Sequence, residues 1–291
     1  MRMVVTGAAG SLGTRVIEEL LERVPADGVV AVVPSGRHGA AFAARGVRLA
    51  VADHDVPESL VGVFRPGDRV LLVPGDGPAA DRAAQHRPVV EAADAAGAAL
   101  LAYVSVPGAL RARAADVHRR TEGLVLASGL PYTLLRTNWC TELYTGRLPL
   151  VLHLGAVTQA AGDGRIASAS RADYAAAAAT VLTGVGGGHE NRTYELGGDT
   201  AWSLSEYAAE ISRRAGREIP YRAVSYDAYL DSLTSAGLPG PAAELVAGVD
   251  ASIARGELSG VNGQLSRLIG RPTTPMPWSV AEAMRGLAGA G

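Results

Sequence analysis

Short apolar runs alternate with helix-length segments along the first half of the chain. Met3 to Thr6 is a β-rich run, and apolar residues recur with helical spacing from Thr14 to Arg23. Further apolar runs predict buried strands at Val29 to Val33, Val47 to Ala52, Arg69 to Val73, Ala99 to Val104 and Thr133 to Leu135. This alternation predicts an α/β fold, a doubly wound parallel sheet of the Rossmann type that binds ligands at the carboxyl ends of its strands.

The pattern becomes less regular after Leu150. A Gly- and Ala-rich segment from Gly155 to Gly164 predicts a loop, and an Ala-rich helix is expected from Ala172. A capped helix is expected near Ser203, and Pro241 to Arg255 is amphipathic. We therefore expect a Rossmann domain over 1–150 and a smaller, interleaved substrate lobe over 151–291, of which about 165–200 returns to the first sheet.

The segment from Thr6 to Gly13 places three glycines between a predicted strand and a predicted helix. Gly7 permits a tight turn, Gly10 lets a diphosphate approach the backbone, and Gly13 lets the helix lie close to the strand. This context predicts a site for a nicotinamide dinucleotide, and the alternative is a glycine-rich loop that binds nothing. The expected contacts are Gly7, Ala9, Gly10, Ser11, Leu12 and Gly13.

The end of the second predicted strand favours NADPH over NADH. Carboxylates that would accept from a ribose 2′-hydroxyl are missing there, whereas Ser35, Arg37 and His38 can contact a 2′-phosphate. The alternative for Arg37 is a solvated loop residue. Asp53 can accept from the adenine amine or cap its own loop. Pro74 and Asn138 complete the predicted cofactor contacts.

Composition narrows the possible partners and compartments. The 291 residues carry a net charge of −2, which disfavours nucleic acid as a partner. We find neither a secretory leader nor the roughly 20 consecutive apolar residues that a membrane span needs, so we expect a cytoplasmic protein that does not enter membranes. Cys140 is the single cysteine, which excludes an intrachain disulfide. A homodimer is possible.

All 27 basic residues are arginines, because the sequence contains no lysine. A Schiff base is therefore impossible, and so is a dehydrogenase mechanism in which a lysine holds the ribose and lowers the pKa of a tyrosine. The histidines show no spacing typical of a metal site, so we expect no metal.

Several segments resemble the NmrA-like, atypical short-chain dehydrogenase/reductase family, and within it the bacterial NADPH-dependent quinone oxidoreductases. The glycine turn is similar to the family's T-G-A-T-G-x-L-G. The likeness continues over nearly the whole chain at Gln85 to Arg87, Ser128 to Arg136, Gly162 to Ser168, Arg171 to Tyr174 and Leu268 to Pro275. The resemblance implies hydride transfer from NADPH to a quinone or a related conjugated carbonyl.

The chain also departs from the family's pattern. The family's usual arginine after the second strand falls at Pro34, so Arg37 would have to replace it. The segment from Arg136 to Tyr144 resembles a family stretch that lines the substrate pocket, R-N-G-W-Y-x-E-N-Y, but differs from it at Thr137, Asn138, Cys140 and Leu143. This departure implies a different substrate.

Candidate catalytic residues lie at the end of the fifth predicted strand and in the helix that follows it. Typical short-chain dehydrogenases carry Tyr-x-x-x-Lys where this chain reads Ala114 to His118. His118 can donate a proton or a hydrogen bond, and Ser105 and Tyr103 can hydrogen-bond a substrate oxygen. The alternatives are a surface histidine and two packing or turn residues.

Trp139, Tyr144 and His153 are candidates for an aromatic wall around a planar substrate, although Trp139 alone is equally compatible with a core position. The sequence thus favours an NADPH-dependent reductase of quinones or related conjugated or aromatic carbonyl compounds. Two alternatives remain open: a non-catalytic sensor of NADP(H), and a redox-neutral isomerase or cyclase on the same fold.

Overall fold

The computed structural model describes residues 1–75, 82–108, 110–111 and 114–289. It divides into two compact units, each of which is discontinuous in sequence. Unit 1 comprises Met1–Val106, Asp116–Thr137 and Arg171–Glu195, and unit 2 comprises Pro107–Ala115, Asn138–Ser170 and Leu196–Gly291.

Unit 1 contains a seven-stranded sheet with the order β3-β2-β1-β4-β5-β6-β9. The pairings of its neighbouring strands from β3 to β6 are all parallel. The strands are β1 (Met3–Val5), β2 (Val29–Val33), β3 (Arg48–Val51), β4 (Arg69–Leu72), β5 (Leu100–Ser105), β6 (Tyr132–Thr137) and β9 (Arg192–Leu196). The predicted doubly wound parallel sheet is confirmed, and its order reverses direction between β1 and β4.

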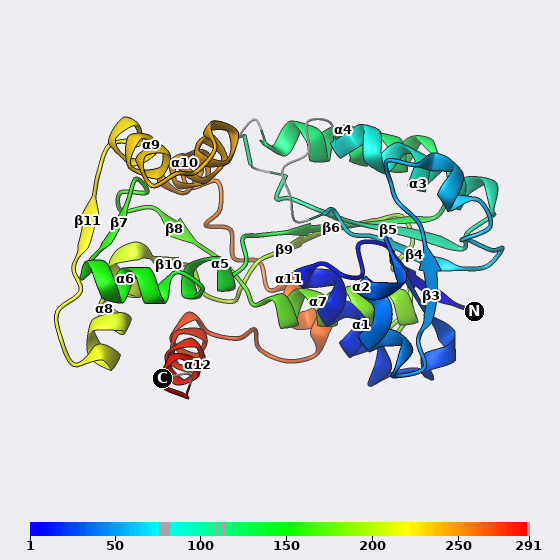
Figure 1. Cartoon of the computed structure of the whole chain (residues 1–291), viewed down its shortest axis with the longest axis horizontal. Coiled ribbons are helices and arrows are strands. Elements are labelled where there is room, and N and C mark those ends of the chain that lie inside the picture. Colours follow the sequence, from blue (N-terminus) through cyan, green and yellow to red (C-terminus); the bar gives the residue numbers. More distant parts are fainter. Residues whose placement is uncertain (76–81, 109, 112–113, 290–291) are drawn as a thin grey trace. The chain divides into compact units, whose positions relative to one another are not determined.

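Helices cover both faces of this sheet, with α3 (Arg82–Ala95) and α4 (Ala114–Ala127) on one face and α1 (Ser11–Leu21) and α7 (Arg171–Thr183) on the other (Figure 1). The inner strands β1, β2, β4 and β5 are largely buried on both sides, which explains why they read as apolar runs; all five residues of β2 are buried. The alanines at 175–179 of α7 are buried, and such small side chains let α1 pack closely beside it. The short α2 (Gly36–Ala43) follows β2.

Unit 2 is built mainly of helices around two small sheets. One pairs β8 (Arg165–Ile166) with β10 (Trp202–Ser203), and the other pairs β7 (Val157–Gln159) with β11 (Tyr221–Ala223). Its helices are α5 (Glu142–Thr145), α6 (Leu148–Leu154), α8 (Leu204–Ala215), α9 (Tyr226–Ser235), α10 (Gly240–Ala254), α11 (Gln264–Ile269) and α12 (Met276–Gly289).

The local predictions in this unit were partly right. The expected cap is confirmed, because the Ser203 side chain accepts from the amide of Glu206 while the Glu206 carboxylate accepts from the amide of Ser203. The prediction of a loop from Gly155 to Gly164 was wrong in its middle, where β7 runs from Val157 to Gln159. Three residues are too few for an alternating pattern to show, so the pairing with β11 decides this strand.

Within the described ranges, none of the helices combines the length and the apolar character that a membrane crossing requires.

Candidate functional site

The predicted glycine turn connects β1 to α1 in unit 1, next to the point where the strand order reverses. Gly7 has a φ of +60°, and a Cβ atom there would lie 2.8 Å from the carbonyl oxygen of Val73. A Cβ at Gly13 would lie 2.2 Å from the carbonyl oxygen of Gly7. Both positions therefore require glycine, and together they bring the start of the helix against the strand.

The amino end of α1 suits a diphosphate. Gly10 is the N-cap residue, and no side chain caps the helix. The amides of Leu12 and Gly13 lie in the first helical turn, where a helix supplies no carbonyl partner. No acidic side chain occupies this turn, so nothing there repels an anion. The cradle that the structure describes thus fits the diphosphate of a dinucleotide.

The residues predicted to contact the 2′-phosphate of NADPH follow the end of β2. Ser35 is the N-cap residue of α2, and its hydroxyl lies 2.8 Å from Nδ1 of His38. Arg37 is exposed in the first turn of the same helix. The structure thus brings the three side chains onto one helix start, beside the strand that adjoins β1.

Asp53 and Pro74 follow β3 and β4 at the same edge of the sheet. The carboxylate of Asp53 accepts from the amide of Asp55 at 3.0 Å, so it caps its own turn while remaining exposed. The cofactor contacts predicted for Asp53, Pro74 and the other residues of unit 1 stay predictions.

Tyr103 and His118, two separate candidates for catalysis, lie next to each other in unit 1. The Tyr103 hydroxyl lies 2.8 Å from Nδ1 of His118, and the tyrosine is fully buried on β5. Burial, and then the positive charge of Arg82, lowers the pKa of His118 to about 4. Burial raises the pKa of Tyr103 well above its usual value. Both groups are therefore neutral near pH 7.

Ser105 belongs to a polar network that the sequence analysis did not anticipate. Its hydroxyl donates to Glu122 on α4 at 2.6 Å, and the same carboxylate accepts from Arg136 on β6 at 2.9 and 2.7 Å. Arg136 also donates to Glu195 at 2.9 Å. Hydrogen bonds from Arg136 and Ser105 outweigh the burial of Glu122 and lower its pKa. The network joins the strands β5, β6 and β9 to the helix α4 of unit 1 through charge-assisted hydrogen bonds.

The substrate candidates lie in unit 2, where two of the three meet. Trp139 and Tyr144 line one hollow, whereas His153 is exposed near the end of α6 and is not part of that lining. Asn138, predicted as a cofactor contact, is buried in the same unit. Its amide donates to the carbonyl of Leu258 at 2.8 Å and accepts from the amide of Trp139 at 2.7 Å.

Sequence reasoning missed the polar residues of this hollow. Arg147, Gln159 and Asp250 line it together with Trp139 and Tyr144. The signal for Asp250 was present, because it is the single charged residue in a stretch of small and apolar residues from Leu245 to Ala254. A buried carboxylate in such a segment marks a functional candidate.

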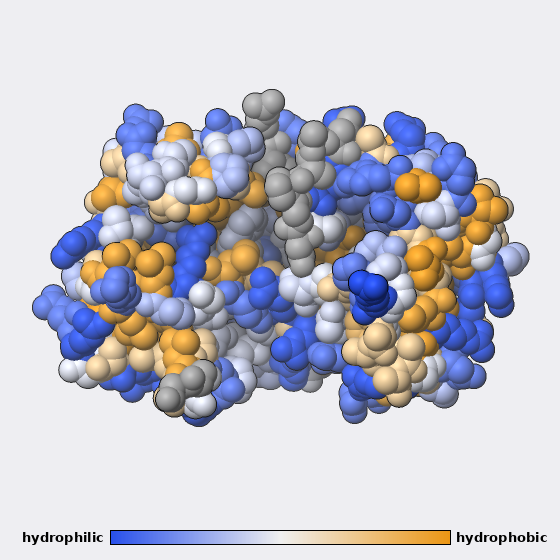
Figure 2. Space-filling model, viewed as in Figure 1, coloured by the Kyte–Doolittle hydropathy of each residue, from blue (hydrophilic) through white to orange (hydrophobic). Residues whose placement is uncertain are grey.

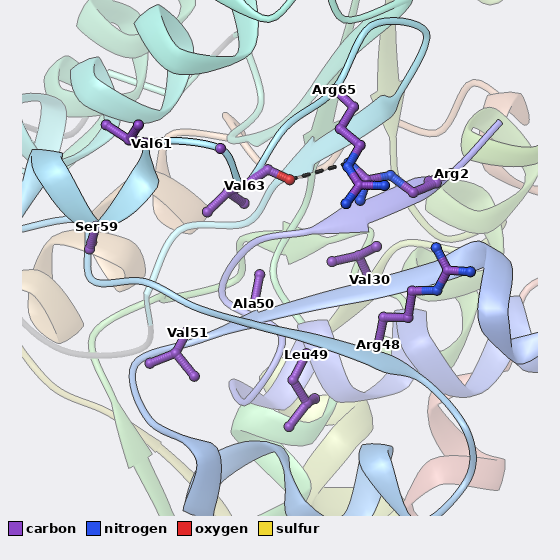
Figure 3. Close-up of a pocket in the computed structure, with 11 residues that line it drawn as sticks. Arg2, Val30, Arg48, Leu49, Ala50, Val51, Ser59, Val61, Val63 and Arg65 are labelled. Atoms are coloured by element: carbon purple, nitrogen blue, oxygen red, sulfur yellow. Dashed lines mark hydrogen bonds between the residues drawn. The ribbon is translucent and has the colours of Figure 1, made fainter.

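A second hollow, of about 280 Å³, belongs to unit 1 (Figure 3). Its lining includes Arg2, Arg48 and Arg65, which precede or begin β1, β3 and β4 and so lie toward the amino ends of the strands. Arg2 is held there by Asp68 and by the carbonyl of Val63. The glycine turn is at the opposite edge of the sheet, so this hollow is separate from the predicted cofactor site.

Comparisons with known proteins agree with this geometry. The sequence profile of a family described as NAD(P)H-binding matches residues 7–184. The chain is 41% identical to quinone oxidoreductase 2 of Escherichia coli over 281 residues, which cover 96% of this chain and 97% of the relative. It is 28% identical to an NmrA-like family domain-containing oxidoreductase of Aspergillus flavus, over 94% of this chain and 92% of the relative.

Solved structures show the same fold. The complex of E. coli NADPH-dependent quinone oxidoreductase with NADPH superposes with a TM-score of 0.93 at 40% identity, over 97% of this chain and 99% of the other. Triphenylmethane reductase of Citrobacter sp. superposes with a TM-score of 0.90 at 34% identity, over 97% and 100%. With its glycine cradle at the strand-order reversal and these matches along nearly its whole length, the chain belongs to the family of NAD(P)H-binding proteins and is related to NmrA-like oxidoreductases.

Proposed function

We propose that the chain is an NADPH-dependent reductase that transfers hydride to a quinone or a related conjugated carbonyl compound. The observation that carries the proposal is the cradle of Gly7, Gly10 and Gly13 at the amino end of α1. The similarity to E. coli quinone oxidoreductase 2, at 41% identity over 96% of the chain, supports the substrate class.

In this proposal the residues of unit 1 hold the cofactor. The turn amides grip the diphosphate, and Ser35 and Arg37 pair with the 2′-phosphate that distinguishes NADPH from NADH. When bound, NADPH supplies a hydride, and a proton from the solvent completes the two-electron reduction of the quinone to a hydroquinone.

The chain contributes little acid catalysis to this reaction. The pKa of His118 is lowered to about 4, so the imidazole is neutral at pH 7 and can act only as a hydrogen-bonding group. A quinone tolerates this, because the negative charge of its reduced form is delocalised and water can protonate it. Binding and orientation are then the main contributions of the protein. We assign substrate contacts to Trp139 and Tyr144 of unit 2, with His153 a weaker candidate because it is exposed.

Turnover tests the proposal directly. Purified protein mixed with NADPH and a panel of benzo- and naphthoquinones should consume the reduced cofactor and form hydroquinone, with NADH a poorer donor. Binding of NADPH without consumption by any member of the panel would instead support the regulatory alternative, a sensor of NADP(H). Product analysis with stoichiometric cofactor would reveal a redox-neutral reaction.

A contact between two copies of the chain is a further part of the proposal. Hydrophobic residues gather near the edge strand β3 in Figure 2, and Val51 and Val61, which both line the hollow of Figure 3, are 57% and 83% exposed. Edge strands with exposed apolar side chains are common places of association. Sedimentation velocity should show a dimer that Val61→Glu dissociates, and a monomer at all concentrations would exclude this contact.

A further inference from the structure

The hollow in unit 2 has apolar walls and the size of one aromatic ring. Its volume is about 170 Å³, and it is lined by segments of α5, β7 and α10, which are labelled in Figure 1. A dry cavity of about 150 Å³ is large enough to bind benzene. The apolar lining consists of Trp139, Leu143, Leu245, Val246 and Val249.

Two buried polar atoms of this lining have no hydrogen-bond partner in the part of the chain that the structure describes. They are the hydroxyl oxygen of Tyr144, which is 5% exposed, and Oε1 of Gln159, which is 7% exposed. The amide nitrogen of Gln159 is engaged, since it donates to the Tyr229 hydroxyl at 3.3 Å. Leaving such an atom unpaired in the interior is destabilising, so these positions favour a ligand that pairs with them.

The ring of Tyr144 is fixed from behind. It meets Trp202 edge-on, with ring centroids 4.9 Å apart, and packs against Tyr207 at 6.1 Å. These contacts restrict the rotamers of Tyr144 and so hold its hydroxyl in one place. The unpaired oxygen is therefore a feature of a packed structure and not of a loose side chain.

Asp250 adds a buried carboxylate that accepts few hydrogen bonds. It is 2% exposed, and the amide of Ala160 donates to one of its oxygens at 2.7 Å. Arg147 also lines the hollow, but it donates to the Tyr229 hydroxyl at 3.2 Å and forms no ion pair with Asp250 in the described structure. Burial raises the pKa of Asp250 to about 6, and the influence of Arg147 offsets this only in part.

Three of the four polar side chains that line the hollow present acceptor atoms, and the fourth, Arg147, donates to the Tyr229 hydroxyl. Gln159 Oε1 and the Asp250 carboxylate can only accept in this arrangement, and Tyr144 can do either. A ligand hydroxyl can donate its proton to one of these acceptors and accept from Tyr144, whereas an ether or carbonyl oxygen in the same place has no proton to donate. We propose that this hollow binds a phenolic ring, whose hydroxyl donates to the Asp250 carboxylate or to Gln159 Oε1 and accepts from the Tyr144 hydroxyl while its face lies against Trp139.

The phenol site concerns the substrate of the proposed reductase, and its role in substrate preference rests on the proposed function. If the chain reduces conjugated carbonyl compounds, its preferred substrates carry a phenolic hydroxyl on the ring that enters the hollow. Binding of the ring itself does not require cofactor or turnover, so the two proposals can fail separately.

Calorimetry with para-cresol and its methyl ether tests the binding. The phenol should bind at least tenfold more tightly than the ether, because tenfold corresponds to about 1.4 kcal/mol, the scale of one buried hydrogen bond. Asp250→Asn should reduce this preference to about twofold, and the exposed Asp231→Asn on α9 is the matched control that should leave it unchanged. Val246→Phe fills the hollow with a larger apolar group and should remove binding without placing a charge in the core.

Equal binding of phenol and ether, binding that survives Val246→Phe, or no binding of either compound would overturn the proposal and leave a structural, water-filled void. Turnover then separates the two proposals. A naphthoquinone with a hydroxyl on its benzenoid ring should have at least a tenfold higher kcat/KM than its methyl ether. If para-cresol binds as expected but no quinone is reduced, the proposed function fails; if quinones are reduced without preference and para-cresol does not bind, the hollow is not a phenol site.

Discussion

Arg37 is the residue on which the choice of cofactor depends in our proposal. It is exposed in the first turn of α2, where the strand β2 ends. An arginine in such a place pairs with a phosphate through two parallel hydrogen bonds, which a ribose hydroxyl cannot replace.

Arg37→Ala should weaken the binding of NADPH about tenfold and change the binding of NADH less than about twofold, since only NADPH carries the 2′-phosphate. Titration of both reduced cofactors, followed by calorimetry, measures the two constants. Arg45→Ala is a matched control, because Arg45 is an exposed arginine just beyond the other end of α2. An equal effect on NADPH and NADH would show that Arg37 does not recognise the phosphate.

His118 provides a second test at the scale of a residue. Its Nδ1 lies 2.8 Å from the Tyr103 hydroxyl, and its pKa is lowered to about 4. At pH 7 the imidazole is therefore neutral and lacks the second N–H proton that a general acid would release. We therefore expect His118→Gln to change kcat for a quinone less than about threefold between pH 6 and 8. Loss of a general acid would cost about 100-fold or more, so a decrease of that size with an altered pH profile would identify His118 as the proton donor.

At the scale of elements, the β1–α1 unit supplies the cofactor cradle. Its glycines differ in whether a side chain in their place would disturb the fold. Gly7 has a positive φ and Gly13 has no space for a Cβ, so substitutions there disturb the fold itself. Gly10 has a φ of −74° and a ψ of 168°, a conformation that any residue adopts.

Gly10→Val should accordingly fold normally but lose at least about 100-fold in affinity for NADPH, because its side chain occupies the place of the diphosphate. Circular dichroism and calorimetry measure the two properties. Gly28 has open space around it and precedes β2 at the other edge of the sheet, so Gly28→Val should change neither the folding nor the affinity for NADPH. Undiminished binding of NADPH by Gly10→Val would refute the placement of the cofactor.

At the scale of the whole molecule, buried titratable groups set the pH dependence of stability. Burial lowers the pKa of His54, of His86 to about 3 and of His118 to about 4. As the pH falls through 6.5, the unfolded chain binds protons at these histidines more readily than the folded chain, so acidification destabilises the fold. Asp250 acts in the opposite direction, because its raised pKa makes the folded chain take up a proton near pH 6 before the unfolded chain does.

Wild-type protein should therefore lose stability between pH 7 and 5, and Asp250→Asn should lose it more steeply, by up to about 1.4 kcal/mol per pH unit, because the opposing group is gone. Thermal unfolding at several pH values measures both slopes. The control Asp231→Asn should follow the wild type, since Asp231 is exposed. Parallel slopes for wild type and Asp250→Asn would show that Asp250 ionises alike in the folded and unfolded chains.

The sequence by itself determined the β1–α1 turn, the parallel sheet and the capped start of α8. The turn and the cap are encoded within about ten neighbouring residues, by a glycine where a Cβ does not fit and by a Ser and a Glu three residues apart. The sheet is encoded by the alternation of apolar runs with helix-length segments. Local spacing decides such features, so they can be read without knowledge of the rest of the chain.

Only the tertiary structure decided the hollow of unit 2 and the network around Glu122. Asp250 and the amide of Ala160 are 90 positions apart in sequence, and Arg136 meets Glu195 across 59 positions. The strand β7 likewise exists because β11 pairs with it. Contacts between distant segments depend on how helices and strands pack, and the burial that raises the pKa of Asp250 arises only when they have done so.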